Sequence, residues 1–257
     1  MTRPFRRVDE ARSGSAMKIS FIVCVSDGPV MTDNLMRSPC LAHGTVHQLI
    51  LAYGCRNAAE GFDMGMRVAS GEVVVFVHQD VFLPPGWDNI FISGYQKVRG
   101  LMSAEVVGIY GLSAVKNGEE PRRLGAVNDR GEWLRGDIPL PARAQSLDEL
   151  LIAVPRGSRL RLDPELGFDL YATDLVLQAE SAGGCGAVID APCEHHSSLP
   201  RTYIPRPILE RFGKAALVFE RKWASRFPIE TPCIRFDPDR PAADLLEYLQ
   251  SRVDSHD

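Results

Sequence analysis

The chain has 257 residues and a formal net charge of -4 at pH 7, and 45% of its residues are hydrophobic and 24% charged. This composition is typical of a globular protein that is long enough to bury a substantial core. The slight excess of acidic residues argues against nucleic acid as a partner, because phosphate contacts need clustered lysine and arginine.

The six cysteines form no Cys-x-x-Cys pair, which argues against a zinc ribbon or a thioredoxin-like redox site, and we expect reduced thiols. Residues 1–16 are polar and lack the apolar stretch of a signal peptide, so we expect a disordered tail. No apolar run approaches the roughly 20 residues that span a bilayer. These features predict a cytoplasmic protein and leave loose contact with a membrane surface open.

Apolar periodicity and turn residues predict the elements of secondary structure. In chain order they are a strand at 18–25, a short helix within 29–41, a strand at 46–53, a helix at 58–69, a strand at 73–77, a helix at 87–99, a strand at 106–110, a β-hairpin or loop at 117–136, a strand at 147–155, a helix at 172–182, a strand at 186–189, and helices at 206–226 and within 242–253.

Strands and helices alternate through the first half of the chain, which predicts an α/β protein with a mostly parallel sheet. No internal repeat and no linker rich in Pro, Gly and Ser divides the sequence. We therefore expect one domain over residues 17–200. The tail at 1–16 precedes it, and residues 201–257 form a helical C-terminal extension packed on the same domain.

Three polar residues, His78, Gln79 and Asp80, follow the buried strand at 73–77. The carboxyl end of a buried parallel strand is where open α/β sheets bind ligands. Asp80 offers the oxygen donors that Mg²⁺ or Mn²⁺ prefers, but one aspartate needs further ligands to hold such an ion. The alternative is an aspartate that only caps a turn or a helix.

Two later positions offer further chemistry. Asp174 lies in the first turn of a predicted helix, where it is either a general base near the ligand edge or a partner of the helix dipole. His195 and His196 follow the last predicted strand as metal ligands, phosphate contacts or a simple loop pair. Because adjacent residues of an extended segment point to opposite sides, at most one should face the site, and we favour His196.

For the other acidic residues, the sequence leaves a functional and a structural interpretation open. Asp27 ends the first strand, at a ligand edge or in a turn. Asp63 and Arg67 lie one helical turn apart, which predicts a surface ion pair. The pair Asp148-Glu149 precedes an apolar run and faces either the site or water. The glycine-rich signatures of dinucleotide and P-loop sites are absent, as is the Gly-x-Ser-x-Gly elbow.

The order of these motifs is informative. A first strand ends in an acidic loop, a helix ends in Ala-Ser-Gly-Glu, and a buried strand ends in His-Gln-Asp-Val. The segments Gly-Phe-Asp-Leu-Tyr-Ala-Thr-Asp-Leu and Ala-Pro-Cys-Glu-His-His-Ser follow. Over residues 18–198 this order resembles glycosyltransferase family 2-like proteins with a GT-A fold, especially a bacterial branch with a His-Gln-Asp motif.

The resemblance implies a GT-A-like, Rossmann-related mixed sheet flanked by helices, which binds a nucleotide-diphospho-sugar donor. It also implies that Asp80 is the metal-facing residue of an Asp-x-Asp-like motif, in which His78 replaces the first aspartate. The ion would be Mn²⁺ or Mg²⁺, bridging the donor's diphosphate. His195 or His196 matches a late histidine that completes the metal site in some GT-A enzymes.

Further roles follow from the same resemblance. Asp27 matches an acidic position near the donor's base, and Gln79 belongs to the donor-binding motif. Asp174 matches the catalytic base of inverting members, and Thr173 replaces the glutamate that usually precedes it. The implied function is an inverting, metal-assisted transfer of a sugar to an acceptor hydroxyl of a glycan, lipid or small molecule.

The departures at His78 and Thr173 leave open a GT-A-like protein that binds a nucleotide or sugar without transferring it. A metal-dependent hydrolase of nucleotide sugars is the third alternative. We expect acceptor contacts from the variable segment at 117–143. The apolar face of the helix at 206–226 either packs on the core or forms a homodimer contact, and we favour the core.

Overall fold

The computed structural model describes residues 17–114, 120–199 and 204–242. Its main sheet has the strand order β2-β1-β3-β11-β5-β12-β9. The strands are β1 (Ile19–Val25), β2 (Gln48–Tyr53), β3 (Val73–Val77), β5 (Ala104–Gly108), β9 (Ala142–Ala144), β11 (Leu151–Pro155) and β12 (Cys185–Val188). β1 is parallel to β2 and β3, and β12 is parallel to β5. β11 runs antiparallel between β3 and β5, and β9 antiparallel to β12, so the sheet is mixed. The other five strands all point the same way, as expected for a mostly parallel sheet.

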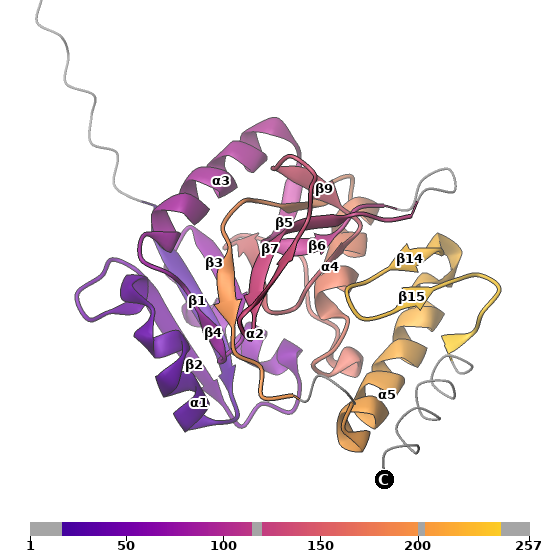
Figure 1. Ribbon diagram of the computed structural model, residues 1–257, viewed down its shortest axis with the longest axis horizontal. Helices are drawn as coiled ribbons and strands as arrows, with labels where there is room; N and C mark the ends of the chain where they lie inside the picture. Colours follow the sequence, from indigo (N-terminus) through magenta and orange to yellow (C-terminus); the bar gives the residue numbers. More distant parts are fainter. Residues whose placement is uncertain (1–16, 115–119, 200–203, 243–257) are drawn as a thin grey trace, which may run out of the picture.

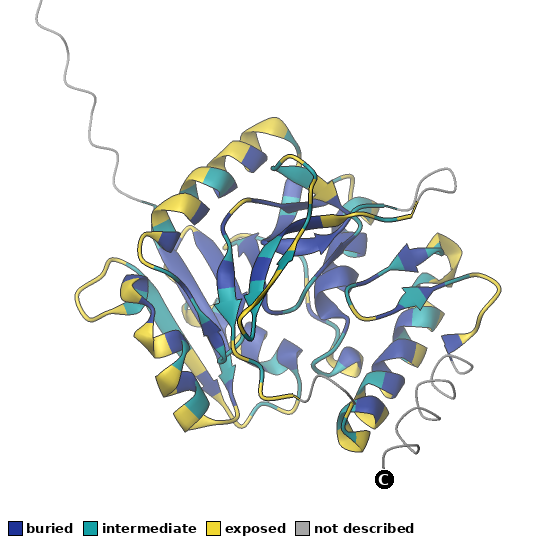
Figure 2. Ribbon diagram, in the orientation of Figure 1, coloured by how far each residue is buried: buried dark blue, intermediate teal, exposed yellow. Residues whose placement is uncertain are grey.

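Helices cover both faces of this sheet (Figure 1). They are α1 (Gly28–Asp33), α2 (Ala58–Val68), α3 (Trp87–Leu101) and α4 (Tyr171–Ser181), and a further helix, α5 (Arg206–Trp223), packs on α4. Alternate residues of β3 point to opposite faces: Val75 packs in one cluster with residues of α3, and Phe76 in a second cluster with residues of α2 and α4. Burial on both faces explains why β3 reads as a continuous apolar run (Figure 2).

A second sheet, in the order β10-β6-β7-β13-β4, lies beside the first. Its strands are β4 (Val81–Phe82), β6 (Tyr110–Leu112), β7 (Arg123–Asp129), β10 (Ser146–Leu147) and β13 (Cys193–His195), and β8 (Glu132–Arg135) pairs with β7. The strand β4 begins directly after Asp80, and β13 pairs with it in antiparallel orientation. This pairing joins a late segment of the chain to the carboxyl end of β3.

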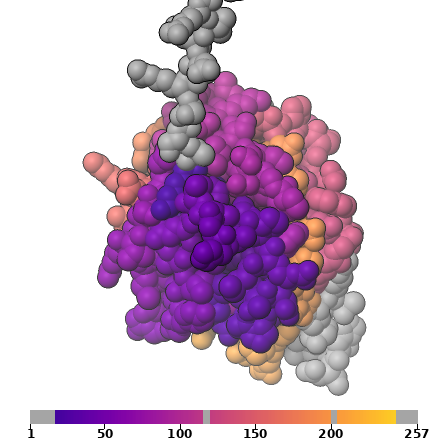
Figure 3. Space-filling model, turned by 90° about the vertical axis from the view of Figure 1, so that its left-hand side faces the viewer, coloured from indigo at the N-terminus to yellow at the C-terminus, as the bar shows by residue number. Residues whose placement is uncertain are grey.

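The C-terminal part packs on α4. A third apolar cluster joins Leu177 of α4 to Phe219 of α5 and to Phe236 in the hairpin of β14 (Ile229–Glu230) and β15 (Arg235–Phe236). In Figure 1 this layer lies on the far side of the molecule from β2 and α1. The space-filling view of Figure 3 faces that opposite side, which the N-terminal part of the chain forms (indigo to purple). Apolar residues of α5 are thus buried in this cluster, whereas Leu217 of the same helix is exposed, and the choice between core packing and a homodimer contact stays a prediction.

Most expected elements are present, with differences in two of them. The helix expected within 29–41 is α1 followed by two 3-10 turns, Leu35–Arg37 and Pro39–Leu41. The strand expected at 147–155 is divided between β10 and β11, because its first residues pair with β6 instead of the main sheet. The tail at 1–16 and almost all of the helix expected within 242–253 lie outside the described residues. Over the described ranges, no helix is both long and apolar enough to cross a membrane.

Candidate metal centre and adjoining cavity

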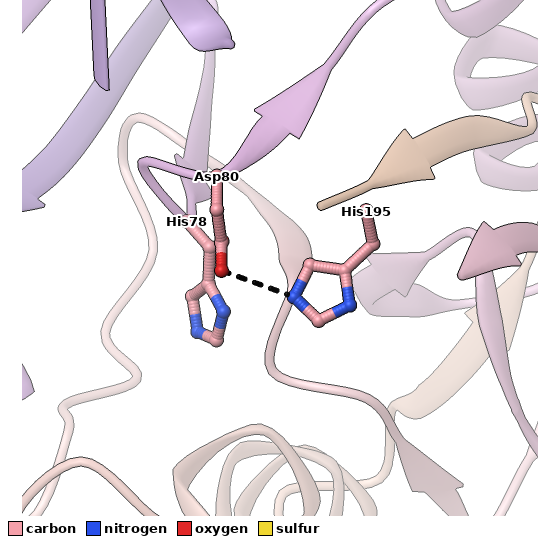
Figure 4. Close-up of side chains that lie close together, drawn as sticks. All are labelled: His78, Asp80 and His195. Carbon is pink, nitrogen blue, oxygen red and sulfur yellow. Dashed lines mark ion pairs between the residues drawn. The ribbon is translucent and has the colours of Figure 1, made fainter. Parts of the chain in front are cut away.

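Two neighbouring strand ends bring three side chains together. His78 and Asp80 leave the carboxyl end of β3, where the N–H of His78 donates to the carbonyl of Leu150. His195 ends β13, opposite Val81 in the register with β4. This register is why a residue more than a hundred positions later lies beside Asp80 (Figure 4).

The three side chains form a group of the kind that holds a metal ion. One donor atom from each of His78, Asp80 and His195 lies within 4.8 Å of the other two. Nε2 of His195 is 3.5 Å from Oδ2 of Asp80, the contact dashed in Figure 4. Two imidazoles and one carboxylate suit Mn²⁺ and other transition metals better than Mg²⁺, which prefers oxygen ligands. The residues present therefore fit a divalent ion, with Mn²⁺ favoured over Mg²⁺.

His195 is held in place by a second carboxylate. Nδ1 of its ring is 3.0 Å from Oδ1 of Asp129, on β7. Because Asp129 accepts a proton from Nδ1, Nε2 is the nitrogen that can give up its own proton and offer a lone pair to a metal ion, as in the carboxylate–histidine pairs that support metal ligands. Burial alone would lower the pKa of His195, but the hydrogen bond and the charge of Asp80 outweigh it and raise that pKa. The same contact holds the pKa of Asp80 below its usual value despite burial.

The tautomer of His78 follows from its neighbour Tyr171. The tyrosine hydroxyl has one proton, which it donates to the carbonyl of Glu149 at 3.1 Å. Its oxygen must then accept from Nε2–H of His78, at 3.2 Å. Nδ1 of His78 is left as the nitrogen with a free lone pair. Burial, as the largest cause, lowers the pKa of His78, which keeps the ring neutral and able to bind a metal.

Gln79 lies between the two potential ligands, and its side chain forms hydrogen bonds that connect the end of β3 to the end of β1. Its Oε1 accepts from the backbone N–H groups of Ser26 and Asp27, both at 3.0 Å. Its Nε2 donates to Oγ of Ser26 at 2.9 Å. The side chain thereby fixes the loop after β1 against the loop after β3.

We expect Gln79→Ala to lower the free energy of unfolding by about 1–2 kcal/mol, because it leaves two backbone N–H groups to water alone. Chemical denaturation measures this change. Gln79→Glu is the matched control, since it keeps the oxygen that accepts both N–H groups, and it should cost less. Equal losses in the two variants would contradict the role given to the amide oxygen.

A cavity of about 290 Å³ adjoins the metal centre. One part of its wall is apolar or weakly polar, and the other is polar and charged. It is lined by Cys24, Val25, Ser26, Ala52, Cys55, Phe76, Val77, His78, Gln79, Asp80, Phe168, Tyr171 and Arg211. Two of the residues expected at the donor, Gln79 and Asp80, are among them.

Arg211 brings a positive charge to this cavity from α5. Asp169 holds its guanidinium through two bonds, from Nε at 2.7 Å and from Nη2 at 2.9 Å. The guanidinium carbon lies 6.0 Å from the ring centre of Phe168. No sequence motif pointed to Arg211, because it lies outside every one of them and reaches the cavity through the packing of α5.

Asp174 does not line the cavity and is occupied elsewhere. Its side chain is fully buried, with Oδ1 2.8 Å from Nζ of Lys222 and 2.8 Å from Nε1 of Trp223, both on α5. Oδ2 accepts from Gln178 at 2.7 Å. The role of Asp174 as a base stays a prediction, and these contacts favour a structural role.

The other candidate residues divide between the site and its surroundings. His196 does not join the group. Its side chain is 41% exposed and pairs with Glu194 at 3.3 Å, so the preference for His196 over His195 is reversed. The alternation behind that preference holds, but the strand register decides which histidine points inward. Asp27 caps α1 by accepting from the N–H of Val30 and does not line the cavity.

Asp148 and Glu149 lie at the same edge of the sheet as His78, because β11 starts where β3 ends. Asp148 is close enough to influence the pKa values of His78 and His195. Burial, followed by the charge of Asp148, holds the pKa of Glu149 well above its usual value. Both residues thus lie at the end of the sheet that carries the metal group, and neither lines the cavity.

No known protein family matches the sequence, and no curated protein matches it significantly. Solved structures do match. A crystal structure of GalNAc-T7 with UDP, GalNAc and Mn²⁺ aligns at a TM-score of 0.50 and 12% identity, over 93% of this chain and 55% of that one. The chain thus spans about half the length of GalNAc-T7.

Two further structures align over most of the chain. A mannosyltransferase from Pyrobaculum calidifontis, in complex with GDP-Man and Mn²⁺, has a TM-score of 0.48 and 14% identity, over 94% of this chain and 74% of that one. Glucosyl-3-phosphoglycerate synthase from Mycobacterium tuberculosis, with Mg²⁺ and UDP, has a TM-score of 0.47 and 14% identity, over 83% of this chain and 80% of that one. The match to GalNAc-T7 shows that this chain has the mixed α/β fold of GT-A enzymes.

Proposed function

We propose that this protein is a glycosyltransferase that moves a sugar from a nucleotide-diphospho-sugar donor to an acceptor hydroxyl. The observation that carries the proposal is the group of His78, Asp80 and His195, which lies at the carboxyl end of β3 and opens onto a cavity. Ligand sites of open α/β sheets occur at this edge. The fold adds support without identifying the reaction.

His78, Asp80 and His195 would hold the divalent ion. When bound, Mn²⁺ would hold the donor's diphosphate and offset the charge that develops on the leaving nucleoside diphosphate. Asp129 and Tyr171 position the two imidazoles for that task, from outside the ligand group.

Different parts of the cavity wall suit different parts of the donor. The apolar wall near Cys24 and Ala52 suits a nucleobase, and Ser26 offers polar atoms beside it. Arg211 lies at the same cavity as Asp80 and suits a phosphate oxygen, because a guanidinium binds phosphate through paired N–H donors. We place the nucleoside along β1 and the diphosphate between Asp80 and Arg211.

Arg211→Ala should weaken nucleoside diphosphate binding about tenfold, the effect of losing a hydrogen bond to a charged group. Calorimetric titration with UDP and GDP in the presence of Mn²⁺ measures it. Arg206→Ala is the matched control, since Arg206 lies on the same helix, pairs with Glu210 at its exposed surface and does not line the cavity. Equal affinity in Arg211→Ala and the parent protein would show that Arg211 does not contact the donor.

In the reaction, the acceptor hydroxyl would attack the anomeric carbon opposite the leaving diphosphate, so the configuration inverts in a single displacement. The hydroxyl proton must pass to a base. Asp174 was expected in this role from the resemblance, but its carboxylate already has three partners. We propose the pair of Asp148 and Glu149 instead, because β11 begins where β3 ends and both residues therefore lie at the same end of the sheet as His78, although neither lines the cavity.

The engagement of Asp174 also favours a second candidate, a GT-A-like protein that binds a nucleotide or sugar without transferring it. Incubation with a panel of nucleotide sugars and Mn²⁺ separates the two, with free nucleotide and sugar products measured by mass spectrometry. Transfer to an added acceptor supports the enzyme. Binding without turnover supports the inactive protein, and free sugar without an acceptor product identifies a hydrolase.

A further inference from the structure

A second cavity, of about 490 Å³, lies at the opposite edge of the main sheet. It is lined by Asp63, Met66, Arg67, Arg156, Gly157, Ser158 and Arg161. Arg156 follows Pro155, which pairs with Val73 at the amino end of β3. The donor cavity lies at the carboxyl end of the same strand, so the two cavities are separate.

Arginine side chains dominate the charge of this cavity. Three guanidinium groups line it, from the last turn of α2, the end of β11 and the segment that follows, against one carboxylate, that of Asp63. A fourth arginine of the same segment, Arg159, lies close by. It lines a neighbouring cavity that shares Gly157 and Ser158 with this one. Such a concentration of positive charge is local, because the whole chain has a net charge of -4.

Within the described ranges, the three guanidinium groups of this cavity form no ion pair with a carboxylate. The ion pair expected between Asp63 and Arg67 is not among the ion pairs of the structure, and Arg156 has none there either. The nearby carboxylate of Glu72 instead accepts from the N–H of Lys18. Elsewhere in the protein, exposed arginines such as Arg122 and Arg226 do have a carboxylate partner.

The segment that carries the arginines is fixed. Nη1 of Arg161 donates to the carbonyls of Ser158 and Leu160, at 3.0 and 2.8 Å. Gln178 of α4 accepts from the N–H of Arg161 and donates to its carbonyl. Preorganised groups lose less entropy on binding, so this segment is suited to hold a ligand.

We propose that this cavity is a binding site for a phosphate monoester or diphosphate group. Guanidinium groups match the oxygens of phosphate in charge and in geometry, and several of them around one cavity suit an anion with more than one negative charge. The group belongs either to a soluble phosphorylated compound or to a phospholipid headgroup. The site is independent of the proposed transfer reaction, because none of its residues lines the donor cavity.

The test uses the full chain with Asp80→Asn as background and a chelator present, so that diphosphate binding at the metal centre is suppressed. Calorimetric titration with pyrophosphate at physiological ionic strength should give one saturable site. Arg156→Ala and Arg67→Ala should each weaken it about tenfold, and the double variant more. The two side chains that are removed, Arg67 and Arg156, are exposed, as is Arg161, which is kept. Thermal unfolding should therefore show that the variants fold.

Arg37→Ala is the matched control, since Arg37 is also exposed but lines neither cavity. A second arm measures sedimentation with phosphatidylcholine vesicles, with and without phosphatidate. Arginine-dependent binding to pyrophosphate alone assigns a soluble ligand, and arginine-dependent binding to phosphatidate vesicles assigns a headgroup. Absence of both, or an equal loss in Arg37→Ala, would overturn the proposal.

Discussion

Asp80→Asn should abolish the Mn²⁺-dependent part of nucleoside diphosphate binding and, with it, sugar transfer. Asp80 supplies the one carboxylate of the ligand group, next to two imidazoles. Removing a residue that only supports a metal ligand typically costs 10–100-fold in metal affinity, so loss of the ligand itself should cost about 100-fold or more. Calorimetric titration of UDP and GDP, with Mn²⁺ and with a chelator, measures the effect.

Asp33→Asn serves as the control for this experiment, because Asp33 is an exposed carboxylate at the end of α1. Asp129→Asn should give an intermediate loss, since Asp129 holds His195 without joining the ligand group. If Asp80→Asn bound nucleoside diphosphate as the parent does, with the same dependence on Mn²⁺, the proposed metal centre would be wrong.

Asp174→Ala should destabilise the protein by about 3 kcal/mol, the lower end of the range for breaking a buried ion pair. The lower end applies because Lys222 is partly exposed and retains Asp163 as a partner at 3.0 Å. Trp223 also loses the acceptor for its indole N–H. In a chain of this size the melting temperature should fall by roughly 6–12 °C, which differential scanning calorimetry measures.

Glu165→Ala is the matched control for stability. It removes an ion pair that also involves α5, between Glu165 of the 3-10 turn Pro164–Leu166 and Arg221, but both side chains are about 70% exposed and the pair should contribute little. For catalysis, the comparison is Asp174→Asn against Glu149→Gln at a temperature where both are folded. Loss of turnover in Asp174→Asn, with unchanged stability and full activity in Glu149→Gln, would restore Asp174 as the base.

The fold could be predicted from the sequence to the extent that it rests on local patterns. The run Val73–Val77 is apolar because both faces of the strand are covered. A continuous apolar run of this length can be recognised in the sequence as a buried strand. The antiparallel insertion of β11 between β3 and β5 could not be predicted, because strand pairing depends on contacts between residues far apart in the chain. The separation of β10 from β11 has the same origin.

The residue types and their order along the chain indicate that polar residues end β3 and that two histidines follow much later, which makes Asp80 and His195 candidates. Which of these side chains meet depends on long-range strand pairing and helix packing. The register of β13 against β4 turns His195, and not His196, toward Asp80. The packing of α5 engages Asp174 with Lys222 and brings Arg211 to the cavity. A residue's type sets the chemistry it can perform, but long-range packing decides whether its side chain is free to perform it.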